Sequence, residues 1–264
     1  MPADLAALLA DLDAESAAFR ALLDPLRDSD WQLATPAPGW SIGDQVAHLA
    51  FFDDAAVTAA THPAEFAAIR AGLTDDGEDA DTMAARYRTL APAQVRDWFD
   101  RSRAALLTTF ASLDPSARVP WFGPPMSVAS TVTARLMETW AHGQDIADTT
   151  GTAREPTGRL RHVAHIGVAA LPYSYAAHGM PVPDAPVRVE LTAPSGELWT
   201  WGSDGARDRV TGPALDFCLL VTRRRHRADT AIVAAGPVAD QWLSIAQSFA
   251  GPPGAGRLPG QFAR

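Results

Sequence analysis

The sequence contains no lysine, so all 22 of its basic residues are arginine. Enzymes that form a Schiff base with a carbonyl substrate use a lysine amine, and this class of mechanism is therefore excluded. The single cysteine, Cys218, has no second thiol to pair with, which excludes an internal disulfide and fits a reducing compartment. Cys218 stands between Phe217 and Leu219 in an apolar run, where we expect a buried thiol.

Long apolar runs and excess positive charge are also absent. No stretch approaches the ~20 apolar residues that span a bilayer, and residues 1–10 lack the basic start of a signal peptide. We therefore expect a cytoplasmic protein with no membrane partner. The net charge of −9 argues against nucleic acid as a partner, because phosphates require a basic face. The one basic run, residues 223–227, is interpreted as solvated, with a site for an anionic substrate as the alternative.

The first two thirds of the chain show the periodicity of helices. Apolar residues recur at spacings of three, four and seven, which predicts amphipathic helices. The expected helices cover about 3–27, 41–62, 92–112, 127–149 and 157–178, with shorter ones over 64–90. Ser41 followed by Asp44 predicts a capping box at the start of the second helix.

A proline-rich segment, 180–186, separates this part from a different pattern. Alternation of apolar and polar residues predicts strands over 187–191, 197–201 and 230–234, and helices over 212–221 and 239–249. The predicted fold class is α+β. We expect an all-helical domain over 1–179, a small α+β domain over 185–250 and a loose tail over 251–264.

Three polar side chains in the helical part are candidates for a metal site. Glu138 and His142 are four residues apart, which puts them on one helix face with Cβ atoms ~5–6 Å apart, close enough to share a cation. His48 is the best candidate for a third ligand, because its apolar neighbours predict that it points inward. The spacing alone also allows a surface hydrogen-bonded pair, with His48 as an ordinary core histidine.

A resemblance to a known family favours the metal site. The second predicted helix opens with a stretch that resembles the signature of the DinB-like metal-binding four-helix bundles, Trp40-Ser41-x-x-Asp44-x-x-x-His48-Leu49. The later Glu138-x-x-x-His142 is similar to the second half of that signature in the mycothiol-dependent maleylpyruvate isomerase branch. The resemblance implies that His48, Glu138 and His142 hold one divalent metal ion, zinc. Nickel, manganese and iron suit the same donors.

The resemblance extends over nearly the whole chain. Residues 121–127 and 135–145 look like those of an actinobacterial subfamily that is usually described only as metal-binding. The second domain resembles the sterol-carrier-protein-like unit of the branch. Trp121 and Phe122 are expected either to close the mouth of a pocket or to pack in the core. Some relatives carry an older name, wyosine base formation, which links them to tRNA, and the acidic net charge argues against that partner.

Three further residues are candidates for catalysis. Asp145 is only ~20° around the helix from Glu138 and is a candidate general base or partner of a ligand histidine. Arg135, one turn before Glu138, is a candidate ligand for a substrate carboxylate. His165 on the fifth predicted helix is a candidate to line the cavity. The alternatives are a solvated residue for Asp145 and an ordinary ion pair for Arg135.

The resemblance implies a metal-dependent enzyme that acts on a small-molecule substrate. Relatives of known activity use mycothiol, so a thiol-dependent isomerase or S-transferase is the first hypothesis. A thiol-independent hydrolase, lyase or cyclase acting on a small carbonyl compound is the second. A carrier that binds a small apolar ligand without reaction is the third. The sequence is compatible with a monomer or a homodimer.

Overall fold

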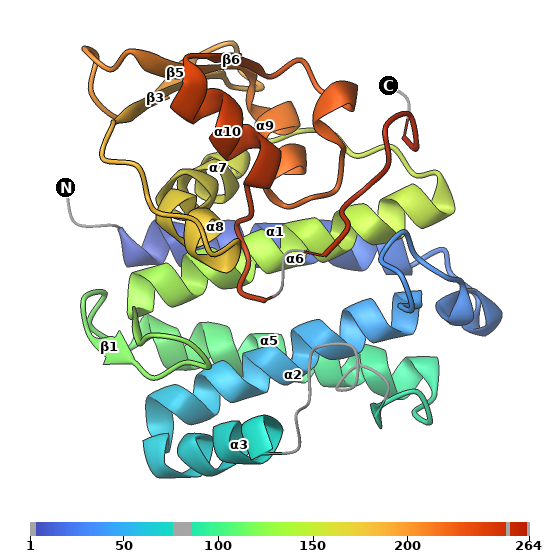
Figure 1. The fold of residues 1–264 in the computed structure, drawn as a ribbon. Helices are drawn as coiled ribbons and strands as arrows, with labels where there is room; N and C mark the ends of the chain where they lie inside the picture. The colour runs from blue at the N-terminus through green and yellow to red at the C-terminus, as the bar shows by residue number, and fades with distance from the viewer. Residues whose placement is uncertain (1–3, 76–85, 252–253, 263–264) are drawn as a thin grey trace. The chain divides into compact units, whose positions relative to one another are not determined.

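The structure, a computed structural model, describes residues 4–75, 86–251 and 254–262 (Figure 1). It divides into two compact units, Met1–Ala153 and Arg154–Arg264. The first is mostly helical and the second combines helices with a mixed sheet, so the predicted α+β class is confirmed. No helix in the described ranges is long and apolar enough to cross a membrane.

The first unit is built around a bundle of long helices. Within it α2 packs against α5 and α6, and α1 packs against the same two helices (Figure 1). The long helices are α1 (Leu5–Leu23), α2 (Ile42–Thr61), α5 (Pro92–Ala111) and α6 (Val128–Thr150), and the shorter elements are η1 (Asp28–Gln32), α3 (Pro63–Asp75), β1 (Arg118–Val119) and β2 (Met126–Ser127). The long helices agree with the periodicity of the sequence. Part of the segment expected to hold short helices, residues 76–85, lies outside the described residues.

The start of α2 is fixed by the predicted capping box. The Ser41 hydroxyl accepts a hydrogen bond from the Asp44 N–H at 3.2 Å, and the Asp44 carboxylate accepts one from the Ser41 N–H at 2.8 Å. Arg88 adds an ion pair to Asp44 at 2.8 Å and donates to the Gly39 carbonyl at 2.7 Å. Because the cap sets where α2 begins, it also sets the position of His48 two turns later.

A buried ion-pair network joins the long helices. Asp53 on α2, which is fully buried, accepts from Arg103 on α5 at 2.7 Å and from Arg135 on α6 at 2.9 Å. Arg103 also donates to Thr139 on α6 at 2.9 Å and to Ser16 on α1. The network therefore reaches all four helices. In a low-dielectric core, each of these charges depends on the others for compensation.

We predict that Asp53→Asn destabilises the protein by about 3–5 kcal/mol, because it leaves two buried guanidinium groups without their counter-charge. The free energy of unfolding from denaturant titration is the measurement. The matched control is Asp24→Asn, which removes the carboxylate of an exposed Arg96–Asp24 pair and should cost at most about 1 kcal/mol. Equal losses in the two variants would contradict a structural role for the network.

The second unit contains a four-stranded sheet with helices. The sheet has the order β4-β3-β5-β6, in which β3 and β5 are parallel and the outer pairs are antiparallel. The strands are β3 (Val187–Thr192), β4 (Leu198–Trp201), β5 (Asp208–Pro213) and β6 (Val233–Ala235). The helices are α7 (Leu160–Ala169), α8 (Leu171–Ala177), α9 (Ala214–Val221), η2 (Arg227–Asp229) and α10 (Pro237–Ile245).

The structure differs from the expected organisation between 154 and 213. The helix expected over 157–178 is two helices, because Pro172 in the first turn of α8 has no N–H to continue the hydrogen-bond ladder of α7. Both belong to the second unit rather than to the helical domain. The reason is that α7 packs on α9 so closely that a Cβ on Gly167 would lie 2.7 Å from Val221 Cγ2.

The central strand β5 was not predicted, and Gly212–Pro213 ends this strand instead of opening a helix. Gly212 has φ +147°, and a Cβ there would lie 2.8 Å from the Ala231 carbonyl oxygen. The glycine therefore lets two backbone segments approach each other. A glycine and a proline in so short a run hide a strand from periodicity analysis.

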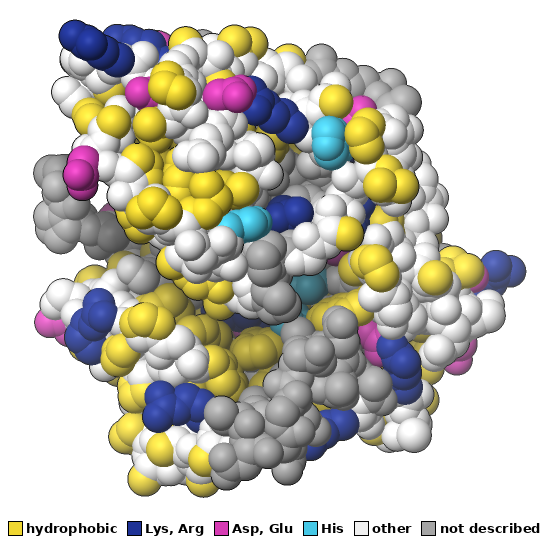
Figure 2. Space-filling model, viewed as in Figure 1, with side chains coloured by type: hydrophobic (Ala, Val, Ile, Leu, Met, Phe, Trp, Pro, Cys, Tyr) yellow, Lys and Arg dark blue, Asp and Glu magenta, His cyan; other side chains and the backbone are white. Residues whose placement is uncertain are grey.

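Charged side chains are dispersed on the face of the molecule drawn in Figure 2. Arginine side chains and Asp or Glu side chains alternate with hydrophobic and uncharged ones, and the described residues form no broad basic patch on that face. This agrees with the acidic composition.

Candidate metal centre

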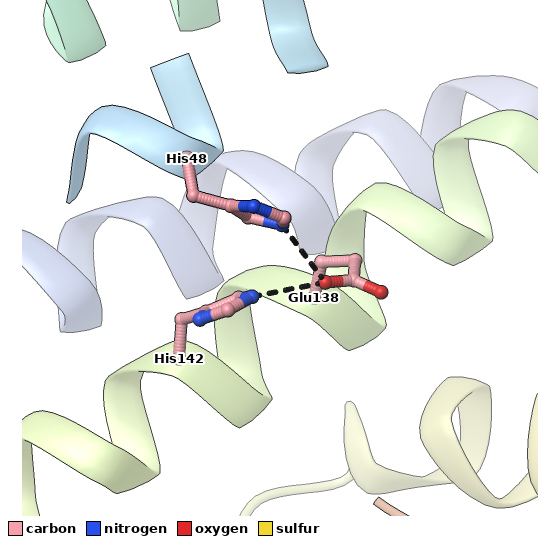
Figure 3. Close-up of side chains that lie close together, drawn as sticks. All are labelled: His48, Glu138 and His142. Carbon is pink, nitrogen blue, oxygen red and sulfur yellow. Dashed lines mark hydrogen bonds and ion pairs between the residues drawn. The ribbon is translucent and has the colours of Figure 1, made fainter. Parts of the chain in front are cut away.

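The three side chains proposed as metal ligands meet inside the helical unit. His48 projects from α2, and Glu138 and His142 project from successive turns of α6 (Figure 3). The Glu138 carboxylate oxygen Oε2 lies 3.0 Å from His142 Nε2 and 3.6 Å from His48 Nε2. One candidate ligand atom from each residue lies within 4.8 Å of the others. The three side chains are 9–20% exposed, so the cluster is largely, but not wholly, shielded from solvent.

The spacing of these atoms fits a tetrahedral metal ion. Ligand atoms that each lie about 2.0–2.1 Å from a tetrahedral zinc ion are separated from one another by about 3.3 Å. The separations of 3.0 and 3.6 Å fall on either side of that value. Two imidazoles and one carboxylate are also donors that zinc accepts. The residues present therefore fit the group.

The electrostatic environment sets the protonation states that a metal ion requires. Burial lowers the pKa of His48 to about 4, and the neighbouring charge of His142 lowers it further, so the His48 imidazole is neutral near pH 7. Burial acts to raise the pKa of the Glu138 carboxyl, but hydrogen bonds and charge from the two histidines outweigh it and hold the pKa well below its usual range. Metal ligands must be a neutral imidazole and an ionised carboxylate.

Aromatic rings surround the two histidines. The Trp40 ring lies 5.2 Å from the His48 ring and stacks on the His142 ring at 5.8 Å, and the Phe52 ring lies 4.6 Å from His48. The centre is thus open to ligands from few directions and lies beside apolar surface. In such surroundings, electrostatic interactions are stronger than in water.

Trp121 and Phe122 continue this aromatic cluster. Both rings are partly buried and pack on Phe52, at 6.0 and 5.3 Å between centroids, and Phe122 also contacts Phe66 at 5.1 Å. The loop before α6 is therefore packed on α2 and α3. These contacts correspond to the core-packing alternative.

The structure places the other candidates in different surroundings. Arg135 Nε donates to Asp53 at 2.9 Å and Nη2 donates to the Leu49 carbonyl at 3.1 Å, which is the ion-pair alternative of the sequence analysis. Asp145 is fully buried on α6, which differs from the solvated alternative. His165 is an exposed residue of α7 in the second unit.

One residue near the centre was not predicted. Gln45, fully buried on α2, accepts a hydrogen bond from His142 Nδ1 through its Oε1. It lies three residues before His48, so the two side chains share one face of α2. A buried amide on the apolar face that carries a ligand histidine is a signal that sequence reasoning could use.

Comparison with known proteins now places the chain. The family model described as mycothiol maleylpyruvate isomerase N-terminal domain matches residues 12–147, which include all three clustered side chains. The chain belongs to this family. A second family model, described as wyosine base formation, matches residues 183–234.

Relatives and solved structures agree with that placement. Uncharacterized proteins from two strains of Mycobacterium tuberculosis are each 44% identical to the chain, over 97% of it and 100% of their own length. The crystal structures of a mycothiol-dependent maleylpyruvate isomerase and of a mutant of it match with a TM-score of 0.58 and 17% identity, over 88% of this chain and 93% of theirs. This likeness shows a common fold, and the family itself includes an isomerase.

We predict that protein purified without chelator contains about one metal ion per chain, because the three ligand atoms are already close together. His142→Ala and Glu138→Gln should each lose it, as measured by elemental analysis. The matched control is His62→Ala, since His62 is an exposed histidine of the same unit at the end of α2. Metal retained in all variants would place the ion elsewhere, and absence from the unaltered protein would reduce the cluster to a hydrogen-bonded triad.

Proposed function

We propose that this chain is a zinc-dependent enzyme of the mycothiol-dependent maleylpyruvate isomerase family, with His48, Glu138 and His142 as the metal ligands. In this proposal it uses a low-molecular-weight thiol to isomerise a small electrophilic substrate or to transfer sulfur to it. The observation that carries the proposal is the convergence of three ligand atoms within 4.8 Å of one another. Family membership supports the choice of chemistry.

The donor set matches a reactive site better than a structural one. Structural zinc sites have four protein ligands, whereas reactive sites have three and leave one position for water or substrate. When bound, the ion supplies a Lewis acid that stabilises a thiolate or polarises a carbonyl oxygen. The partial exposure of Glu138, 20% of its side chain, gives small molecules a route to the cluster.

The residues of the chain then have separate tasks. Glu138 supplies the negative charge of the ligand set, and Trp40 and Phe52 pack on the two imidazoles and exclude water. Arg135 acts as a positioning residue, because its bonds to Asp53 and to the Leu49 carbonyl hold α6 on α2. A role for Arg135 in binding a substrate carboxylate, for Asp145 as general base and for His165 in the cavity stay predictions.

The thiol comes from outside the chain. The thiolate adds to one carbon of a conjugated double bond, and the electron pair moves onto the carbonyl oxygen. Rotation about the resulting single bond and expulsion of the same thiolate give the isomer, with no net consumption of thiol. If the substrate carries a leaving group, that group departs instead and the sulfur stays on the product.

The test is turnover of an electrophile with and without mycothiol, starting with maleylpyruvate. We expect turnover that requires mycothiol and falls at least about 100-fold in His142→Ala, because removal of a ligand removes the metal. Equal rates without thiol, abolished by chelator, would favour the hydrolase, lyase or cyclase hypothesis. Ligand binding that is unchanged after metal removal, with no turnover, would favour the carrier.

We also predict that Cys218 takes no part in the chemistry. Its side chain is fully buried, burial raises the pKa of its thiol, and its Sγ contacts the Leu160 carbonyl oxygen at 3.4 Å. Iodoacetamide should leave the folded protein unmodified and label it once per chain after denaturation, as read by intact mass. Labelling of the folded protein with concomitant loss of turnover would contradict the requirement for an external thiol.

A further inference from the structure

We propose that Gln45 is a positioning residue that keeps a proton on His142 Nδ1, so that the lone pair of Nε2 faces Glu138 and His48. The purpose of this arrangement, metal binding, rests on the proposed function. The hydrogen-bond geometry does not, because it involves only side chains and backbone of the helical unit.

The direction of each hydrogen bond follows from the end of a short chain of polar groups. The Thr35 hydroxyl donates its only proton to the Trp40 carbonyl at 2.9 Å. Thr35 Oγ1 must then accept from Gln45 at 2.9 Å, which identifies the atom facing Thr35 as the amide nitrogen. The other end of the amide, facing His142, is therefore the carbonyl oxygen Oε1. An amide oxygen only accepts, so His142 Nδ1 carries the hydrogen.

The groups that orient Gln45 are themselves fixed. Gln45 is fully buried and Thr35 is 9% exposed. The Thr35 N–H donates to the same Trp40 carbonyl at 2.7 Å, and Ala34 pairs with Ser41 in an antiparallel bridge. The loop between η1 and α2 is thus closed on itself at the foot of α2. Rotation of the Gln45 amide by 180° would place two acceptors, or two donors, against each other at both ends.

The same loop controls both the chemistry and the orientation of the His142 ring. The Trp40 carbonyl ends the hydrogen-bond chain, and the Trp40 indole stacks on the His142 imidazole at 5.8 Å with an interplanar angle of 21°. His48 has no such support, since its buried Nδ1 lacks a hydrogen-bond partner in the described structure. The two histidines of the centre are therefore not equivalent, and His142 is the one that is held ready.

Loss of Gln45 should reverse the protonation of the ring. With no acceptor at Nδ1, the neutral imidazole gains by placing its hydrogen on Nε2, where the Glu138 carboxylate lies 3.0 Å away. That hydrogen occupies the lone pair that a metal ion needs. Gln45→Leu, which is similar in size and has no acceptor, should produce this state. Gln45→Glu keeps an acceptor and should not.

The first measurement is ¹⁵N NMR of histidine-labelled, metal-free protein at mildly alkaline pH. We expect the His142 Nδ1 signal of the unaltered protein and of Gln45→Glu to be that of a protonated nitrogen. In Gln45→Leu it should be that of a bare nitrogen. An Nδ1 signal that is bare in the unaltered protein, or the same in Gln45→Leu, would overturn the inference whether or not the protein binds metal. The dispersion of the same spectra reports whether each variant is folded.

The second measurement is zinc affinity by competition with a chromophoric chelator. Gln45→Leu should bind zinc about 10–100-fold more weakly, and Gln45→Glu should restore the affinity. The matched control is Gln94→Leu, which removes the cap of the Ala91 N–H at the start of α5 and should leave zinc affinity unchanged. Unchanged affinity in Gln45→Leu would overturn the inference and leave the proposed function intact. If the unaltered protein binds no zinc, the proposed function fails and the NMR result alone decides on Gln45.

Discussion

The pairing of one buried aspartate with two buried arginines is the interaction on which the helical unit depends. Asp53 lies five residues after His48 on α2, and Arg135 lies three residues before Glu138 on α6. The ion pair between Asp53 and Arg135 at 2.9 Å therefore fixes the register of the two helices within about a turn of the clustered side chains. A bundle held by apolar packing alone could slide by a fraction of a turn at little cost. Charges without other partners in a dry core prevent this, because displacement leaves them uncompensated.

Around the cluster the fold combines acceptor atoms with apolar walls. Three ligand atoms that can each offer a lone pair lie close together, which is unfavourable unless protons or a metal ion lie between them. The rings of Trp40 and Phe52 keep water from weakening their interaction. The loop that carries Trp40 also orients Gln45, so ligand geometry and water exclusion share one structural origin. This economy explains why the motif at the start of α2 is dense in polar residues.

The family relationship and the site support each other at different levels. The family match and the fold make a metal-dependent isomerase of small molecules the natural proposal, while the clustered side chains connect that proposal to particular atoms. The second unit, which matches a family model of its own, is a separate compact body with its own core. Its only thiol is buried there, which makes an external thiol the simplest source of sulfur for the proposed reaction.

The sequence by itself determined the long helices, the capping box at Ser41, the α+β class and the identity of the three clustered residues. These are local patterns of apolar spacing, caps and a recognisable motif. Only the tertiary structure decided that α7 belongs with the sheet, that β5 is its central strand, and that Arg135 pairs with Asp53. Each of these depends on contacts between residues far apart in the chain, and the 97 positions between Gln45 and His142 are the clearest example. Local spacing carries no record of which distant atom a buried polar group will meet.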